Sequence, residues 1–295
     1  MTLIIFALTI GIIYSLVALS SIFSFRILGF PDMTPDGSLL VGASFGGIVL
    51  LNSGSMILSL MCAFCVGSVF GALTAALHNI IGISKLLSGI LVMTMLYSIS
   101  LRIMNTSNLS LINSATIWNS EYSEISQYLN LGIAILITGV ILFILYLFLM
   151  TNIGLKIRAL GDSEDTAKKI DLSIQRYNTI GLSLSNGIAG LSGGIISQYQ
   201  GFVDISMGTG SVIMSLAAII IGEILLKPKN MFSLLLCAIV GMVIYQGIIT
   251  IAFRFGLPST DMKITTVLLT IVFIFIGKIR KKTHTVDRQI GNRNI

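Results

Sequence analysis

Long apolar runs recur along the whole chain, and they constrain its fold more than any other feature of the sequence. Of the 295 residues, 55% are hydrophobic and only 10% are charged, and the mean hydropathy is +0.96. A typical soluble domain has about 25% charged residues. Because runs of about 20 apolar residues cross the hydrocarbon core as helices, the sequence predicts an all-α, polytopic transmembrane helix bundle.

We expect about nine spans, including a discontinuous helix near the N-terminus. The predicted spans cover residues 3–25, 38–51, 55–77, 85–103, 129–150, 179–198, 211–226, 231–253 and 262–279. Residues 1–280 are expected to form a single transmembrane domain, and residues 281–295 a basic tail. Glycines at four-residue spacing are expected to let these helices approach closely, namely Gly42 with Gly46, Gly67 with Gly71 and Gly190 with Gly194.

The basic residues gather in three places, which are the segment 151–178, the loop 227–230 and the C-terminal tail. Lys and Arg are enriched in cytoplasmic loops, so all three are predicted to be cytoplasmic. The acidic loop 104–128, which has no Lys or Arg, then falls outside, together with the N-terminus. The enrichment of Lys and Arg in cytoplasmic loops is enough to explain the net charge of +6. Membrane lipid is therefore the expected surrounding, and binding of nucleic acid is not expected.

The stretch FPDMTPDGS at residues 30–38 breaks the first long apolar region. Pro31 and Pro35 each remove a backbone donor and restrict the preceding residue, so a continuous helix is not expected there. Asp36 is expected to cap the helix that follows Gly37, which gives it a role in folding. The segment as a whole has two readings, a capped surface loop or a broken helix along a transport pathway in which Asp32 acts.

A second polar break, SQYQGFVDISMGTG, occupies residues 197–210 and is predicted to lie outside. Its polar candidates are Gln198, Gln200 and Asp204. Paired breaks in the two halves of a transporter point to its binding site, although a plain outer loop explains the same composition.

The third polar segment, GDSEDTAKKIDLSIQRY at residues 161–177, is predicted to begin a short cytoplasmic helix capped by Asp162 or Ser163. Glu164 and Asp165 in its first turn suit the helix dipole. An apolar stripe follows at helical spacing, formed by Ala167, Ile170, Ile174 and Tyr177. The spacing alone leaves open whether this stripe packs against the protein itself or is exposed to a partner.

The sequence lacks the motifs of several enzyme classes. No phosphate-binding loop of an ATPase and no pairing of a nucleophile with a base is present, so the chain is not expected to be an enzyme or to hydrolyse ATP itself. Cys62 and Cys65 have metal-ligand spacing but no second ligand pair, so neither a metal site nor a cofactor is expected.

Taken together, the motifs at 30–38 and 158–172 and the stretch 191–223 resemble the permease subunits of ATP-binding-cassette importers, in the branched-chain amino acid and simple sugar superfamily. The chain is most similar to the branch linked to aromatic amino acid uptake. The resemblance implies a permease in the bacterial inner membrane that imports a small polar solute by alternating access. It also implies a homodimer, a separate ATP-binding subunit and an extracytoplasmic substrate-binding protein.

The resemblance favours the functional reading of both open segments. It implies a substrate pathway that includes Asp32, Asp36, Gly37, Gln198, Gln200 and Asp204. It also implies an ATPase-coupling segment at about 155–178 that includes Glu164, Asp165, Ala167, Ile170, Asp171, Ile174 and Tyr177. The family usually has glycine at the bend where Asp171 stands and a β-branched residue in place of Pro35. Asp tolerates left-handed geometry better than most residues, so Asp171 is compatible with the bend, but the sequence alone leaves open whether the bend is preserved.

Three alternatives remain open at this point. An ion-coupled secondary transporter would use Asp32, Asp36 or Asp204 to bind its coupling ion. An importer of the same class for sugars or nucleosides would share every motif above. A membrane scaffold or enzyme would have no transport role.

Overall fold

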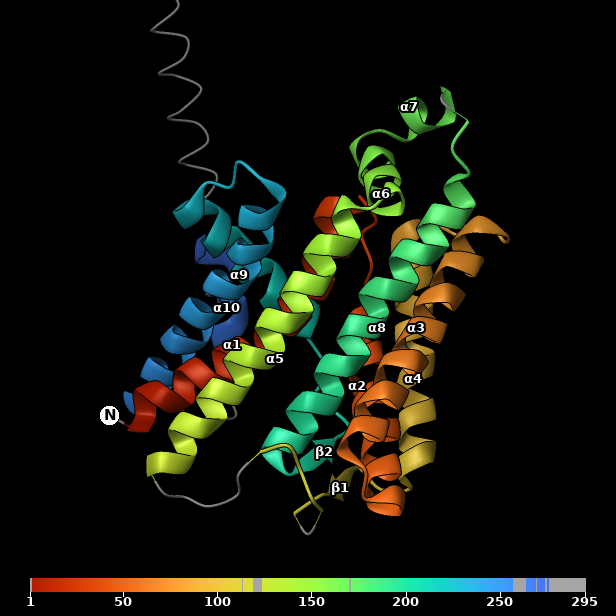
Figure 1. Cartoon of the computed structure of the whole chain (residues 1–295). Coiled ribbons are helices and arrows are strands. Elements are labelled where there is room, and N and C mark those ends of the chain that lie inside the picture. The colour runs from red at the N-terminus through yellow and green to blue at the C-terminus, as the bar shows by residue number, and fades with distance from the viewer. Residues whose placement is uncertain are drawn as a thin grey trace, which may run out of the picture.

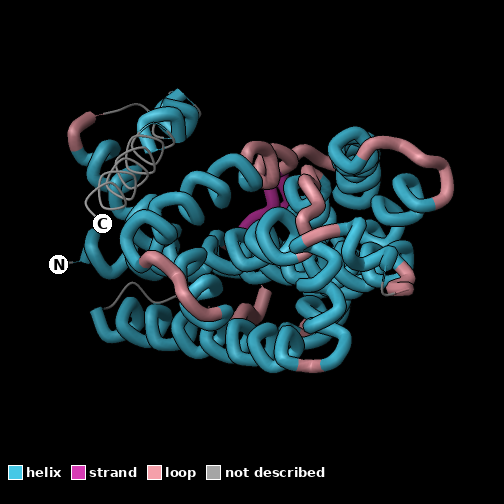
Figure 2. The backbone as a smooth tube through the Cα atoms, turned by 90° about the horizontal axis from the view of Figure 1, so that it is seen from above, coloured by secondary structure: helices cyan, strands magenta, loops and turns pink. Residues whose placement is uncertain are grey.

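The computed structural model describes residues 2–112, 114–118, 124–169, 171–256, 264–268, 270–273 and 275. Figure 2 shows that nearly all of this backbone is helical, with two short strands lying together. Within the described residues, seven helices are long and apolar enough to cross a membrane. The predicted all-α polytopic bundle is confirmed.

The elements follow one another in the order of the predicted spans. They are α1 (Thr2–Ile22), η1 (Phe23–Ile27), α2 (Thr34–Ser53), α3 (Met56–Asn79), α4 (Lys85–Met104), β1 (Asn108–Ser110), α5 (Glu124–Met150), α6 (Asn152–Asp162), α7 (Glu164–Lys169), α8 (Ile174–Gln200), β2 (Phe202–Asp204), α9 (Ser211–Leu226) and α10 (Met231–Arg254). The span predicted at 262–279 falls largely outside the described residues, as does the tail at 281–295. Residues 264–268 and 270–273 are helical.

The first apolar region is interrupted as predicted. The α1 helix widens into the π-helical turn η1, and the backbone from Gly29 to Met33 is not helical. The α2 helix then begins at Thr34, four residues earlier than expected, and it has 20 residues rather than the 14 of the predicted span. The early start is possible because Pro35 lies in the first turn, where backbone N–H groups have no partner within the helix.

The helices form two groups that stand side by side in Figure 1. In one group, α1 packs against α5, α9 and α10. In the other, α2 packs against α3, α4 and α8. Contacts between α1 and α8 join the two groups, so the break between α1 and α2 lies where the chain passes from one group to the other.

The polar loops lie at two ends of the bundle. The strand β1 pairs antiparallel with β2, with Leu109 opposite Val203, so the two loops predicted to share one side of the membrane do lie together. Figure 1 shows β1 and β2 at one end and α6 and α7 at the other. The predicted coupling segment and the predicted outer loops are therefore separated by the length of the bundle.

Close helix packing depends on the glycines, as the four-residue spacing predicted. A Cβ atom on Gly42 would lie 2.2 Å from the carbonyl oxygen of Gly190, and one on Gly67 would lie 2.3 Å from that of Asn186. No real Cβ atom tolerates such distances. The α2, α3 and α8 helices therefore contact one another backbone to backbone.

Candidate functional site

Asp32 lies at the centre of the break and is fully buried. Its Oδ1 atom accepts a hydrogen bond from the backbone N–H of Thr34 at 2.8 Å, which helps to start α2. Its Oδ2 atom accepts one from the Nδ2 of Asn186 on α8, also at 2.8 Å. The amide oxygen of Asn186 in turn accepts a hydrogen bond from Ser38 at 2.7 Å. Asp32 thus holds the broken backbone to the middle of α8.

The α3 and α4 helices complete the surroundings of Asp32. A Cβ atom on Gly89 of α4 would lie 2.8 Å from the Oδ1 of Asp32, so only glycine lets α4 come this close. The hydroxyls of Thr34 and Thr74 lie 2.8 Å apart and join the start of α2 to α3. Asn186 was not predicted, but an amide side chain within an apolar span is a recognisable signal of a hydrogen bond between helices.

Asp36 caps a helix, but not the one that was predicted. Its carboxylate accepts hydrogen bonds from the backbone N–H groups of Gly210 at 2.9 Å and Val212 at 2.7 Å, and from the hydroxyl of Ser211 at 2.7 Å. These are the first groups of α9, where a negative charge is favoured by the helix dipole. The prediction that Asp36 caps the helix after Gly37 is wrong, because α2 has already begun at Thr34 and Asp36 lies inside its first turn.

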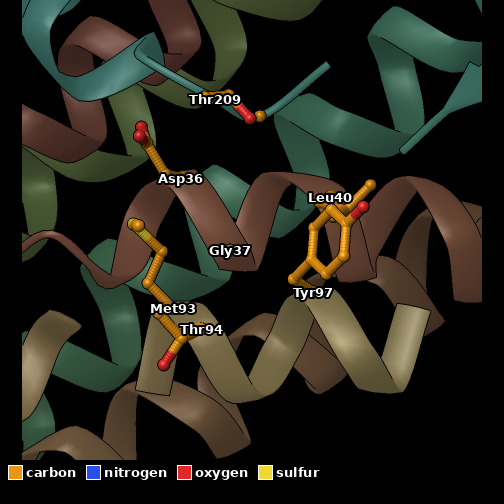
Figure 3. Close-up of a pocket in the computed structure, with 8 residues that line it drawn as sticks. Asp36, Gly37, Leu40, Met93, Thr94, Tyr97 and Thr209 are labelled. Atoms are coloured by element: carbon orange, nitrogen blue, oxygen red, sulfur yellow. The ribbon is translucent and has the colours of Figure 1, made fainter. Parts of the chain in front are cut away.

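This contact of Asp36 builds a pocket between α2, α4 and the turn that precedes α9 (Figure 3). The cavity has a volume of about 220 Å³ and is lined by Asp36, Gly37, Leu40, Met93, Thr94, Tyr97, Gly208 and Thr209. This volume is below the range of about 300–1,000 Å³ that is usual for sites of drug-sized ligands, so it suits a small solute. The lining combines the phenol ring of Tyr97, one thioether and two threonine hydroxyls with a carboxylate that already has three hydrogen-bond donors.

Two glycines bring the walls of the pocket together. A Cβ atom on Gly37 would lie 2.9 Å from the side chain of Leu96 on α4. One on Gly208 would lie 2.1 Å from the carbonyl oxygen of Asp36. The contribution of α4 was not predicted, since no motif in the span at 85–103 distinguishes Met93, Thr94 and Tyr97 from their neighbours.

The other predicted pathway residues lie away from this pocket. Gln198 donates a hydrogen bond to the hydroxyl of Ser59 at 3.3 Å, and Gln200 donates one to the hydroxyl of Tyr14 at 3.4 Å. Asp204, the half-buried last residue of β2, accepts a hydrogen bond from the backbone N–H of Ser206 at 2.8 Å. The structure therefore brings Asp36 and Gly37 into one pocket, with Asp32 in the break beside it, and leaves these three residues outside the pocket.

The predicted short helix of the coupling segment is present as α7. The hydroxyl of Ser163 accepts a hydrogen bond from the backbone N–H of Thr166 at 3.2 Å, so Ser163 is the cap. Asp171 adopts the left-handed conformation with φ of 53°, so the bend forms without glycine. The backbone N–H groups of Asp171 and Leu172 bond to carbonyls of α7 at 3.1 Å and 3.0 Å and close the turn.

The apolar stripe of this segment packs mainly against the protein itself. Ala167 is fully buried and Tyr177 is 7% exposed, so their interpretation as a free surface for a partner is wrong. The Nζ atom of Lys156 lies 5.7 Å from the centroid of the Tyr177 ring. Ile174 is half-buried, and Ile170 lies outside the described residues. The side chains that this segment leaves exposed are polar, namely Asp165, Thr166, Lys168 and Lys169 on α7.

Glu164 forms an ion pair with Lys85, the first residue of α4. The hydrogen bond from Lys85 holds the pKa of the Glu164 carboxyl below its ordinary value, against a smaller opposing effect of partial burial. Both side chains are partly exposed, so the pair contributes little to the stability of the fold. It does fix α7 against the end of a helix that lines the pocket.

Comparison with known proteins agrees with this architecture. The chain is 38% identical over 284 residues to the tyrosine transport system permease protein of Clostridioides difficile (strain R20291). The aligned residues cover 95% of this chain and 94% of that protein. It is 30% identical over 287 residues to an uncharacterized protein of Rickettsia prowazekii (strain Madrid E). The aligned residues cover 96% of this chain and 99% of that protein.

No solved structure matches the chain. The family model described as branched-chain amino acid transport system / permease component matches residues 3–277, which include the break, the pocket and the segment from α6 to α7. With this match and the bundle of membrane-spanning helices, the chain belongs to the family of permease components of branched-chain amino acid transport systems.

Proposed function

We propose that this permease is the membrane subunit of an ATP-driven importer that moves an amino acid, preferably an aromatic one, into the cell by alternating access. The observation that carries the proposal is the pocket at the broken helix, which has one wall on α2, one on α4 and a third on the turn at 208–209. An aromatic ring and a thioether on one wall provide apolar contact for a ring. The name of the relative from Clostridioides difficile supports tyrosine as the first substrate to test.

The partners follow from the two ends of the bundle. A cytoplasmic ATP-binding subunit would seat on the exposed polar face of α7, beside the basic residues Lys156 and Arg158 of α6. An extracytoplasmic substrate-binding protein would dock at the end that carries β1 and β2. A second copy of the permease would complete the importer in the bacterial inner membrane, with the N-terminus outside and the C-terminus in the cytoplasm.

The transport test uses the permease reconstituted in proteoliposomes with the ATPase and the binding protein of the same system. We expect ATP-dependent uptake of L-tyrosine that exceeds uptake of L-leucine or ribose. Thr94→Trp fills the pocket and should lower tyrosine uptake about tenfold, the effect of about 1.4 kcal/mol. Met95→Trp is the control, because Met95 is the neighbouring residue, is 38% exposed and does not line the pocket.

Three results would contradict the proposal in different ways. Uptake that follows an ion gradient without ATP would identify a secondary transporter. Preference for ribose or a nucleoside would keep the importer but replace the substrate class. Equal loss of uptake in Thr94→Trp and Met95→Trp would remove the pocket from the pathway.

The orientation has its own test. In a chain without its native cysteines, Ser107→Cys and Asp165→Cys place single thiols at exposed positions at opposite ends of the bundle. An impermeant thiol reagent should label position 107 in intact cells and position 165 only after the cells are opened. The reverse pattern would invert the orientation.

A further inference from the structure

One lysine joins the segment from α6 to α7 to the broken helix. Lys85 forms the ion pair with Glu164 of α7 described above, and its Nζ atom lies 5.5 Å from the centroid of the Phe30 ring. Phe30 is fully buried and opens the break motif. It also meets the ring of His78 edge to face, with centroids 5.2 Å apart. The ring is therefore held by the core while its lysine neighbour reaches outward to α7.

A second contact lies close to the first. A Cβ atom on Gly161, near the end of α6, would lie 2.0 Å from the carbonyl oxygen of Ile27. One on Gly29, whose φ is +66°, would lie 2.9 Å from the carbonyl oxygen of Gly161. The end of α6 is thus in backbone contact with the residues that immediately precede Phe30. The segment from α6 to α7 touches the break through backbone at Gly161 and through a charged side chain at Glu164.

Lys85 belongs to the helix that forms one wall of the pocket, and it contacts the residue that leads into the helix that forms another wall. Lys85 begins α4, which carries Met93, Thr94 and Tyr97 two to three turns later. Phe30 precedes α2, which carries Asp36, Gly37 and Leu40. A displacement of Glu164 would therefore be passed to both helical walls of the pocket by one side chain.

We propose that Lys85 is a positioning residue that transmits the movement of α7 to the pocket, through its ion pair with Glu164 and its contact with the ring of Phe30. This rests on the proposed function, because it requires an ATPase that moves α7. A role in stability alone is a weaker explanation of the ion pair between Lys85 and Glu164, because such a pair contributes little to folding. The Lys85 and Glu164 side chains are 27% and 42% exposed, and pairs of this kind change a folding equilibrium by about fivefold at most.

The test measures the accessibility of the pocket in the complex of the permease with its ATPase. The chain lacks its native cysteines and carries Thr94→Cys, whose reaction rate with a water-soluble maleimide is measured with and without a non-hydrolysable ATP analogue. In the parent we expect the analogue to change the rate. Lys85→Gln, which loses both contacts, should reduce that change about two- to fivefold. Lys85→Arg, which keeps a cation for both partners, should restore it.

Two further variants separate the contacts. Phe30→Leu keeps the ion pair and removes the ring, and it should give an intermediate response. Lys169→Gln is the matched control, because it removes a positive charge from an exposed position on α7, the helix that carries Glu164.

Three other outcomes would overturn the proposed role of Lys85. If the parent rate does not respond to the analogue, alternating access driven by ATP is wrong and the role of Lys85 falls with it. If the parent responds and Lys85→Gln responds equally, the proposed function stands and the role of Lys85 is overturned. If Lys85→Gln no longer co-purifies with the ATPase or no longer folds, Lys85 serves docking or folding, and transmission is overturned as well.

Discussion

The interior where α2, α3 and α8 meet and the short helix α7 are held in place in opposite ways. In the interior, backbones touch through glycines, and the fully buried Asp32 has its hydrogen bonds satisfied. At the α7 end, the main polar link to the helix bundle is an ion pair between two partly exposed side chains. Close-packed backbone has few alternative arrangements, whereas an exposed ion pair can be remade at small cost.

This difference indicates which part of the permease is fixed and which part can move. The interior supplies the rigid frame against which the pocket is built. On the proposed function, we expect α7 to be the part that a partner displaces without unfolding the bundle. The three predictions below test this contrast, and they run from the largest expected effect to the smallest.

The largest effect is expected where backbones touch. A Cβ atom on Gly193 would lie 1.9 Å from the carbonyl oxygen of Leu39, so Gly193→Val must force α2 and α8 apart. We expect a loss of about 3 kcal/mol or more in stability, seen as a near absence of folded permease in detergent by size-exclusion chromatography. Gly139→Val on α5 is the control, since nothing lies within 4 Å of a Cβ atom there. Equal accumulation of the two variants would show that the interior is not rigid.

The two acidic residues of the break should both affect folding. Asp32→Ala removes the carboxylate that accepts hydrogen bonds from the buried backbone N–H of Thr34 and from the Nδ2 of Asn186. The free energy of unfolding should fall by about 2–3 kcal/mol. Asp36→Ala removes the cap of α9 and should cost about 1–2 kcal/mol. The temperature at which half of the permease aggregates in detergent should fall in this order.

Asp204→Ala, at the end of β2, serves as the control for both and should change that temperature little, because the hydrogen bond from Ser206 that it removes is exposed. From the sequence alone, a folding defect is expected for Asp36 only. If Asp32→Ala accumulates and melts like the parent, Asp32 is not needed for folding, as the sequence alone predicts. The interior around Asp32 would then be less constrained than its geometry indicates.

The smallest effect is expected at Glu164. Because its pKa in the folded chain lies below the ordinary value of 4.5, its ion pair stabilises the attachment of α7 above that value and is lost as the pH falls through the folded pKa. With a side chain that is 42% exposed, the contribution should be a few tenths of a kcal/mol. A spin label at Asp165→Cys should become more mobile as the pH falls through the folded pKa of Glu164, which lies below the ordinary value.

In Glu164→Gln, the same label should already be mobile at neutral pH, with no further change in acid. A label whose mobility has the same acid dependence in the parent and in the Glu164→Gln variant would show that another group holds α7.

Several features were readable from the sequence because they depend on neighbours along the chain. The apolar runs determine that the chain spans the membrane as helices, since lipid leaves no other way to satisfy the backbone. Pro31 lies in the break, Pro35 lies in the first turn of the helix that follows it, and Ser163 caps the start of α7. Asp171 determines the bend that follows, through its tolerance of left-handed geometry.

Other features were decided only by the tertiary structure. Asp36 caps α9 rather than its own helix, through contacts that span 174 to 176 positions in the sequence. Ala167 and Tyr177 are buried because α7 folds back onto the bundle, and the pocket includes α4 because Gly37 admits it. The physical reason is that lipid and protein interior are both apolar, so hydropathy along a span does not tell which face meets lipid and which meets another helix. Only packing distinguishes the two.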